Sequence, residues 1–431
     1  MKHILLISLI LILNAYSVFA LNDTISIINA EQAFTLKTNG INLTGQGETI
    51  CIIDTGVNYN HEAFGGCYGN NNPNSSCKVI GGYDFINNDS DPMDPLGHGT
   101  HGAGIAAAKG QMIGIAPDAK IVAIRACNNN FYGHQEADDP NPPCSDSSVR
   151  KGIDWCVSNS KKFNISVISV SIGTGSFNGN CDNLDQSMTS SVNNAVSKNI
   201  SVVFASGNFG NNNAIASPAC IKNAIPVGST NKDDTISWFT DRNQLVKLLA
   251  PGHEILSVNM PGGYWYDSGT SMSAPHVAGA IALMNQYLKS VNRSKTPKEL
   301  ELILANSGKK IYDPESGLNF SRIDSYSALI SLDQEKPAVS AKIKNSTSKL
   351  TINCSGSDLA LKGVSLYVYN STSLHQKKSR SLAGISKYSY SYTFTLKPGN
   401  YTWTCSYVDV KGNRATLVKK KIRITDNFAC N

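Results

Sequence analysis

The sequence of 431 residues lacks any long apolar run beyond its first 20 residues. A membrane-spanning helix needs about 20 consecutive apolar residues, whereas the apolar stretch at residues 4–13 is interrupted by Asn14 after ten residues. Lys2 precedes this stretch, and the small residues Val18 and Ala20 follow it, which is the pattern of a secretory signal peptide cleaved after Ala20. We therefore expect a secreted or extracellular protein without a transmembrane segment.

Acidic residues are scarce in the C-terminal part of the chain. Residues 337–431 contain 15 lysines and arginines but 3 aspartates and glutamates, a net charge of +12, whereas the remainder has 23 against 29, a net charge of −6. This asymmetry indicates two electrostatically different parts. Attachment of the basic part to anionic cell-envelope components at the cell surface is one interpretation. A merely solvated surface, or docking onto the acidic remainder, is the other.

Cysteine is well represented, and its eleven copies fit an oxidising compartment. Two pairs in loop-like stretches would close short disulfide rings, namely Cys67 with Cys77 and Cys127 with Cys144. Cys51 and Cys156 instead lie in apolar patterns, TICIIDTG and GIDWCV, where we expect free buried thiols. About a dozen Asn-x-Ser/Thr sequons, such as that of Asn42, are compatible with a surface glycoprotein.

The pattern of apolar residues up to about residue 332 predicts an α/β fold. Short β-branched runs alternate there with Ala-rich amphipathic stretches. The predicted strands are 49–54, 120–127, 165–173, 200–208 and 223–230, and the predicted helices are 98–108, 147–158, 185–198 and 271–288. Because the runs are apolar throughout, they favour a buried, mostly parallel sheet in a doubly wound arrangement. Active sites in such sheets lie at the carboxyl ends of the strands.

After a linker expected at residues 333–337, alternating strands with turn signals predict a separate all-β domain at 338–431. Cys354 and Cys405 lie 51 residues apart in strand-like contexts, and Trp403 comes just before the second. This spacing resembles an immunoglobulin-like or fibronectin-like β-sandwich, although the usual tryptophan of the third strand is missing. The predicted organisation is a signal peptide at 1–20, a large domain at 21–332, the linker and the sandwich.

Three glycine-rich segments each carry a reactive side chain. IIDTG (52–56) ends a predicted strand at Asp54, whose carboxylate can accept a histidine N–H. GHGTHGAGIA (97–106) carries His98, which can exchange a proton near neutral pH. GTSMSAPHVAG (269–279) places Ser271 at the positive end of an Ala-rich helix.

Each segment also has a plainer interpretation when it is taken alone. Asp54 would then be a turn residue, and Ser271 a helix cap. His98 and His101 lie three residues apart and would suit a metal, but no carboxylate or cysteine accompanies them at ligand spacing.

In the order Asp, His, Ser, the three motifs together resemble those of the subtilisin-like serine proteases, and the similarity spans about residues 25–330. The resemblance implies that Asp54 orients His98, that His98 is the general base and acid, and that Ser271 is the nucleophile of an acyl-enzyme mechanism. No metal is required for that chemistry. The neighbouring polar residues would then be structural, namely His101, His276, Ser268 and Ser273.

The resemblance also assigns the oxyanion site and the substrate site. FASGN (204–208) resembles the family motif whose asparagine, here Asn208, supplies an oxyanion donor beside the Ser271 backbone N–H. Ser171, Ile172 and Gly173 resemble the edge strand to which a peptide adds through backbone hydrogen bonds. The specificity pocket is expected to run past Ala216, and neither this residue nor Phe209 is acidic, so we expect broad specificity with an apolar P1 residue.

A loop before His98 is rich in oxygen donors, as a structural Ca²⁺ site requires. We expect the ligands to be Asp84, Asn87, Asp89 and Asp91. A solvated acidic loop that caps the following helix is the alternative. Another calcium site of the family is expected to be absent, because Ala63 stands where an aspartate would be required. Since 33 residues separate Ala20 from Asp54, we also expect no folding prodomain between them.

The function that the motifs favour is that of a secreted serine endopeptidase. A catalytically silent binding protein with the same scaffold is the alternative, and the intact set of Asp54, His98, Ser271 and Asn208 weighs against it. We expect a monomer whose partners are extended polypeptide substrates, with no nucleic-acid partner.

Overall fold

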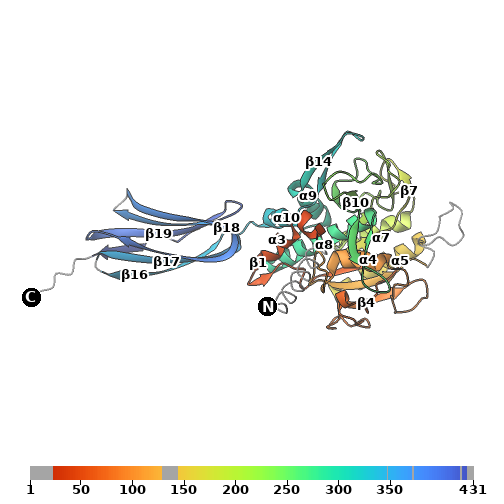
Figure 1. Ribbon diagram of the computed structural model, residues 1–431, viewed down its shortest axis with the longest axis horizontal. Coiled ribbons are helices and arrows are strands. Elements are labelled where there is room, and N and C mark those ends of the chain that lie inside the picture. The colour runs from red at the N-terminus through yellow and green to blue at the C-terminus, as the bar shows by residue number, and fades with distance from the viewer. Residues whose placement is uncertain (1–22, 129–143, 347, 371–372, 418–419, 425–431) are drawn as a thin grey trace, which may run out of the picture. The chain divides into compact units, whose positions relative to one another are not determined.

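The computed structural model describes residues 23–128, 144–346, 348–370, 373–417 and 420–424 (Figure 1). The signal peptide expected at 1–20 lies outside these residues. Contacts divide the chain into an N-terminal unit, Met1–Ala33 with Thr44–Ala328, and a C-terminal unit, Phe34–Leu43 with Leu329–Asn431. No helix in the described part of the chain is both long and apolar enough to cross a bilayer.

A nine-stranded sheet forms the centre of the N-terminal unit, in the order β14-β15-β11-β10-β8-β6-β3-β5-β4. These strands are β3 (Thr49–Asp54), β4 (Val79–Asp84), β5 (Lys120–Arg125), β6 (Ile165–Val170), β8 (Ser201–Ala205), β10 (Ile225–Thr230), β11 (Leu248–Pro251), β14 (Lys309–Asp313) and β15 (Leu318–Arg322). All neighbours run parallel except β14 and β15. Every residue of β3, β6, β8 and β10 is buried. The predicted doubly wound, mostly parallel α/β fold is therefore confirmed.

Helices pack on both faces of this sheet. The pair α4 (His98–Ala107) and α8 (Thr270–Ser290) contacts β3, and the pair α5 (Asp146–Ser158) and α7 (Gln186–Ser197) lies over β3 and β8. Ile53 packs in the cluster under α5 and α7, so its neighbour Ile52 points to the other face. All four predicted helices form, with ends within two residues of the expected positions. The other α-helices of the described residues are α2 (Asp23–Ile27), α3 (Ala30–Thr35), α6 (Ser160–Phe163), α9 (Pro297–Ser307) and α10 (Ser325–Leu332).

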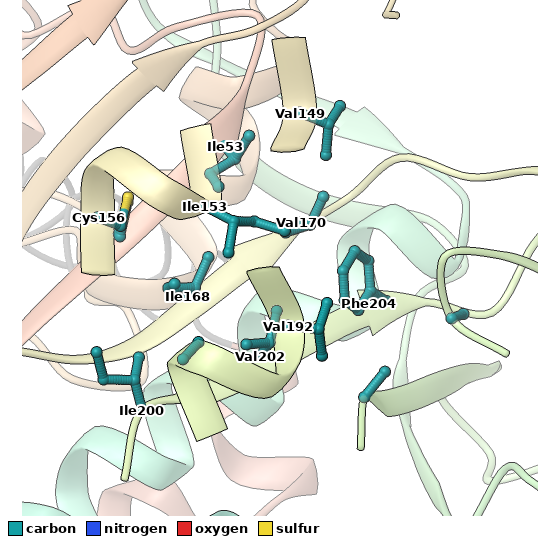
Figure 2. Close-up of a cluster of buried hydrophobic side chains, with 14 of the residues drawn as sticks. Ile53, Val149, Ile153, Cys156, Ile168, Val170, Val192, Ile200, Val202 and Phe204 are labelled. Atoms are coloured by element: carbon teal, nitrogen blue, oxygen red, sulfur yellow. A yellow bond between two sulfur atoms is a disulfide. The ribbon is translucent and has the colours of Figure 1, made fainter. Parts of the chain in front are cut away.

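Figure 2 shows the core between the sheet and α5 and α7, with Ile153 of α5 near Val170 of β6 and Val192 of α7 beside Phe204 of β8. Continuous apolar strands require such cover on both faces, because neither face can be left to water. These helices and strands hold the carboxyl ends of β3 and β6 in fixed positions.

Disulfides follow the prediction in the loops but not in the core. The expected pairs Cys67–Cys77 and Cys127–Cys144 are present, and Cys181–Cys220 adds a third. The expectation of free thiols at Cys51 and Cys156 is wrong, because these residues are buried as predicted but bonded to each other. They lie 105 residues apart in the chain and meet where α5 packs on β3, a contact that the local apolar pattern does not reveal.

The C-terminal unit is all-β, as predicted. Its main strands are β16 (Ala338–Ser346), β17 (Lys349–Asn370), β18 (Ser373–Thr395), β19 (Gly399–Asp409), β20 (Arg414–Thr416) and β21 (Lys420–Ile424). Irregular pairing between Ser357 and Gly363 divides β17 into a first half that pairs with β16 and a second half that pairs with β19. The disulfide Cys354–Cys405 joins the first half of β17 to β19 within one buried core. This arrangement is consistent with the predicted β-sandwich.

The short strands β1 (Lys37–Thr38) and β2 (Ile41–Asn42) pair with each other and belong to the C-terminal unit, where β1 contacts β17. The sequence pattern gave no signal for this grouping, because the two strands lie far from the rest of the unit in the chain. The unit also begins at Leu329, four residues before the linker that was expected to start at 333.

Candidate active site

Asp54 is the last residue of β3, the strand at which the chain stops adding strands on one side of the sheet and begins to add them on the other. From β3 the chain passes to β4 and β5 on one side and then to β6 on the other, and a crevice forms outside the strand carboxyl ends at such a switch point. The Asp54 side chain is buried, and its Oδ1 lies 2.7 Å from His98 Nδ1. The same oxygen accepts a 2.7 Å hydrogen bond from the Thr55 backbone N–H.

His98 is the first residue of α4, and the start of this helix is held by Asp94. One carboxylate oxygen of Asp94 accepts hydrogen bonds from the backbone N–H and hydroxyl of Thr100, at 2.9 and 2.6 Å. Glycine is required beside His98, since a Cβ at Gly99 would lie 2.2 Å from the Gly56 carbonyl oxygen. The helix therefore approaches the end of β3 closely enough for His98 to reach Asp54.

Burial and the Asp54 carboxylate act on the pKa of His98 in opposite directions. Burial alone would lower this pKa because it disfavours the charged imidazolium, but the charge and hydrogen bond of Asp54 outweigh it and raise the pKa above its ordinary value. Since a carboxylate can only accept, His98 Nδ1 carries the proton of their hydrogen bond. That tautomer leaves Nε2 as the basic nitrogen.

Ser271 lies in the first turn of α8, next to the carboxyl end of β6. Its Oγ donates to the Ser171 carbonyl oxygen at 3.1 Å, and Ser171 Oγ donates to the Ser271 carbonyl oxygen at 2.9 Å. These reciprocal bonds join the helix start to the strand end. The Ser271 hydroxyl lies at the positive end of the α8 dipole, which favours negative charge there.

Asn208 follows β8 and is exposed, but its amide group is oriented by Thr270. Asn208 Oδ1 accepts hydrogen bonds from the Thr270 backbone N–H at 2.8 Å and from the Thr270 hydroxyl at 2.9 Å. A backbone N–H can only donate, so the oxygen of Asn208 must face Thr270 and the Nδ2 group faces away. A Cβ placed on Gly269 would lie 3.3 Å from Asn208 Nδ2 and 3.6 Å from the Ser271 backbone nitrogen. The two donors thus converge on one small region, which Gly269 leaves open.

The four residues predicted to contact substrate lie together beyond β6 and in β9 (Ile215–Ser217). Ser171, Ile172 and Gly173 follow the end of β6 and belong to no strand of the described sheet. The Ala216 methyl group would lie 3.0 Å from a Cβ at Gly173 and 3.2 Å from one at Gly207. These close approaches make Ala216 the common neighbour of the predicted substrate segment and of the turn that carries Asn208.

The polar neighbours that the sequence motifs left aside make structural contacts. His101 Nε2 lies 3.0 Å from the Ile255 carbonyl oxygen, and burial lowers the pKa of this histidine to about 4. His276 Nδ1 lies 2.8 Å from the Met272 carbonyl oxygen. Ser273 donates to the Ala250 carbonyl oxygen at 3.0 Å, and Ser268 accepts from the Glu254 backbone N–H at 2.8 Å.

The predicted calcium ligands lie on a loop that makes its own hydrogen bonds. Asp84 is buried, pairs with Arg125 at 2.7 Å, and accepts the backbone N–H groups of Ile86 and Asn87. Asn87, Asp89 and Asp91 are exposed. Calcium at this loop stays a prediction, and Asp84 is engaged elsewhere.

Asp94 and Thr270 are functional residues that the sequence reasoning missed. Asp94 lies between the predicted calcium ligands and His98, and its buried carboxylate caps α4, as in the alternative interpretation of the acidic loop. Thr270 stands beside Ser271 in the third motif, but nothing in the sequence indicates that it orients Asn208, which lies 62 residues away.

Comparison with known proteins connects this geometry to one family. The model of the Subtilase family matches residues 45–321. Alkaline serine exoprotease A of Vibrio alginolyticus is 34% identical over 280 residues, which cover 64% of this chain and 45% of that protein. The thermophilic serine proteinase of Bacillus sp. (strain AK1) is 33% identical over 287 residues, covering 66% and 62%. Thermitase of Thermoactinomyces vulgaris is 35% identical over 289 residues, covering 66% and 89%.

Two solved structures are similar as well. A cold adapted subtilisin-like serine proteinase superposes with a TM-score of 0.51 at 32% identity, covering 65% of this chain and 90% of that one. A protease from Pseudoalteromonas arctica gives a TM-score of 0.55 at 26% identity, covering 67% and 91%. The chain spans less than two thirds of the length of the Vibrio and Bacillus relatives.

Proposed function

The chain belongs to the subtilase family, and we propose that it is a secreted serine endopeptidase that uses Asp54, His98 and Ser271. The observation that carries this proposal is the 2.7 Å hydrogen bond between buried Asp54 and His98, at the end of β3, with Ser271 hydrogen-bonded to the residue that follows the neighbouring strand β6. An aspartate, a histidine and a serine on three separate elements form the constellation that activates a serine nucleophile.

The proposed reaction begins when the Ser271 hydroxyl turns from the Ser171 carbonyl toward His98. Ser271 Oγ attacks the peptide carbonyl carbon while His98 Nε2 takes the hydroxyl proton. The C–N bond then breaks as His98 returns that proton to the leaving amine, and the acyl group stays on Ser271. Water then attacks the ester while His98 takes one of its protons, and His98 returns that proton to Ser271 Oγ as the ester bond breaks and the acid is released. Asp54 stabilises the imidazolium in both halves of the reaction, which accounts for the raised pKa of His98.

The developing oxyanion is stabilised by Asn208 Nδ2 and the Ser271 backbone N–H. Both nitrogens lie within 3.6 Å of one point beside Gly269. Because Thr270 fixes the Asn208 amide before substrate arrives, little reorganisation is needed when negative charge develops.

Extended polypeptides are the substrates that the surrounding backbone favours. Ser171, Ile172 and Gly173 follow β6 outside the described sheet, so a substrate strand can pair with their backbone groups. The Ser171 carbonyl is released when the Ser271 hydroxyl turns away and can then accept a substrate N–H. Ala216 beside this segment and Phe209, which is 72% exposed, offer apolar rather than charged contacts. We infer an apolar P1 preference from them.

Extracellular location and a monomeric state complete the proposal. The signal-like N-terminus and the five disulfides of the described residues support the first. A catalytically silent relative would share these features, so activity is the deciding property.

The test is hydrolysis of casein and of chromogenic peptides by the secreted chain and by Ser271→Ala. We expect cleavage by the wild type, absent from the variant, with faster release after Phe or Leu than after Arg or Asp. Correctly folded wild type without activity on any of these substrates would favour the silent binding protein.

A further inference from the structure

Three aspartates from separate places in the C-terminal unit meet at one point. Asp333 directly follows α10, Asp358 lies in the irregular part of β17, and Asp409 is the last residue of β19. One carboxylate oxygen of each lies within 4.8 Å of those of the other two. Among the residues that the structure describes, no other group of three or more acidic, histidine or cysteine side chains converges in this way.

Asp333 and Asp409 are buried, Asp358 is half-buried, and part of the cluster has no hydrogen-bond partner among the described residues. Asp333 is 1% exposed and Asp409 is 0% exposed. Asp409 Oδ1 accepts the Asn413 backbone N–H at 2.8 Å, whereas Asp409 Oδ2 is buried without a hydrogen-bond partner. Asp358 shows the same division, with Oδ1 accepting from the Leu359 backbone N–H at 2.7 Å and Oδ2 buried and unpartnered. Each of these two residues therefore directs one unsatisfied carboxylate oxygen into a buried site.

The charges of Asp358 and Asp409 have no basic partner among the described residues, since neither carboxylate forms an ion pair with a lysine or arginine there. Burial, together with the neighbouring Asp333 and Asp409 carboxylates, raises the pKa of Asp358 to about 7. Buried charges of one sign are strongly unfavourable unless a counter-charge is present.

Acidic residues are scarce in the C-terminal unit, so their convergence is not a matter of abundance. Residues 329–431, the larger part of this unit, contain 5 acidic residues against 16 basic ones, and three of the five, Asp333, Asp358 and Asp409, are in the cluster. A surface loop of a generally acidic protein would bring carboxylates together by abundance alone. In this basic unit abundance cannot explain it.

We propose that Asp333, Asp358 and Asp409 bind a calcium ion inside the C-terminal unit. Ca²⁺ takes six to eight oxygen ligands at about 2.4 Å, so two of its ligands are at most about 4.8 Å apart, and the three carboxylate oxygens lie within 4.8 Å of one another. The three carboxylates come from three irregular chain positions, and Ca²⁺ tolerates such a ligand arrangement better than Mg²⁺, which demands near-ideal octahedral geometry. Backbone carbonyls and water would complete the shell.

The ion would cross-link the end of α10 to two strands of the β-module. Two hydrogen bonds already join chain segments near this point, Lys411 Nζ to the Ser331 carbonyl at 2.8 Å and Val410 N–H to the Ala360 carbonyl at 2.9 Å. A bound calcium ion would link residues 333, 358 and 409 through their carboxylates. Without it, the three carboxylates repel one another in a buried space, so the C-terminal unit is less stable.

The experiment uses the full chain carrying Ser271→Ala, which prevents self-digestion. Calcium binding is measured by titration calorimetry, and hydrogen exchange by mass spectrometry with calcium or with a chelator. In this parent we expect calcium to slow exchange at residues 329–335, 357–361 and 408–413. We expect Asp358→Asn and Asp409→Asn each to weaken this ion's affinity at least tenfold.

Asp89→Asn together with Asp91→Asn is the matched control, because it removes two acidic residues from the other predicted calcium loop. That control must leave the calcium-dependent protection of the C-terminal unit unchanged. In the presence of chelator, Asp409→Asn should be at least as stable as the parent, since it removes repulsion. Unfolding temperatures that drop equally with and without calcium would assign Asp409 a purely structural role.

Three other results would overturn the proposal. The first is equal hydrogen exchange of the parent with calcium and with chelator. This result does not depend on the folding of any aspartate variant. Both asparagine variants can bind calcium as tightly as the parent. Magnesium can protect the same segments at equal concentration, which would make the site a general divalent site rather than a calcium site.

Discussion

The two units of the chain satisfy buried charge in different ways. In the N-terminal unit, most buried carboxylates have basic partners on the protein, as in the pairs Asp54–His98, Asp84–Arg125 and Asp313–Arg242. In the C-terminal unit, the buried carboxylates of Asp358 and Asp409 face each other and Asp333. Where carboxylates are paired with basic side chains, the protein itself compensates the buried charge. Where carboxylates face one another, the compensation must come from a bound ligand.

Asp241 is an exception within the N-terminal unit. Its Oδ2 atom is buried without a hydrogen-bond partner, and its Oδ1 atom accepts the backbone N–H groups of Phe209 and Asn211. Burial raises the pKa of Asp241, which favours its neutral form. A single buried carboxyl group can remain neutral in this way. For the three carboxylates of the C-terminal unit, two of which have an unpartnered oxygen, the proposed counter-charge is a bound calcium ion.

Replacing Ser271 gives the largest expected effect and tests whether the two units are independent. Ser271→Ala should lower kcat for peptide hydrolysis by roughly 10⁶-fold, because no other group in the site can form the acyl-enzyme. The same variant should keep the calcium-dependent protection of the C-terminal unit. Peptidase assays and hydrogen exchange on one preparation measure both properties. A variant that loses both would show that the units are coupled or that the substitution disturbs folding.

Replacing Asn208 tests the preorganised part of the N-terminal unit. Asn208→Ala should lower kcat by roughly 10²- to 10³-fold with little change in KM, since the amide acts on charge that develops in the transition state. Thr270→Val should cost less, because it removes the hydroxyl donor to Asn208 and keeps the backbone N–H. Asn223→Ala, at an exposed asparagine bonded to Asn193, is the control and should be unchanged. Steady-state kinetics decide between these outcomes.

The pH dependence of activity tests the pairing of His98 with Asp54. Because Asp54 raises the pKa of His98, the histidine becomes protonated, and unable to act as base, as the pH falls through a value above 6.5. We expect kcat/KM to fall about tenfold per pH unit below that value. Asp54→Asn removes the largest effect that raises this pKa and leaves the effect of burial, with smaller contributions from Asp267 and Asp94. The acidic limb should therefore move to lower pH while activity drops by roughly 10⁴-fold. An unmoved limb would contradict the assignment.

The basic surface of the C-terminal unit gives the smallest expected effect. Changing Lys420, Lys421 and Arg423 of β21 to glutamine should lower the salt concentration that elutes the protein from immobilised dextran sulfate, if this surface binds anionic glycans. Casein hydrolysis should not change. The same substitution of Lys151, Lys161 and Lys198, which are exposed on the N-terminal unit, is the matched control. If both sets of substitutions lower the eluting salt concentration equally, the basic surface of the C-terminal unit is merely solvated.

Features fixed by local pattern could be predicted from the sequence. Continuous apolarity predicted β3 and β6, and the glycine-rich motifs placed Asp54, His98 and Ser271 at element ends, where the structure has them. Features that depend on two distant segments could not be predicted. The Cys51–Cys156 disulfide, the bond of Thr270 to Asn208 and the convergence of the three aspartates each join residues that are far apart in the chain. A local sequence pattern contains no information about such long-range contacts.

The central claim is that Ser271 is a nucleophile activated by His98 and Asp54. The most direct measurement is the mass of the protein and its peptides after reaction with a fluorophosphonate, for the wild type, Ser271→Ala and His98→Ala. The account predicts one phosphonyl adduct on the wild type, located on the peptide that contains Ser271, and none on either variant at the same time point. Folded wild type without an adduct, or an adduct on another residue that persists in Ser271→Ala, would contradict it.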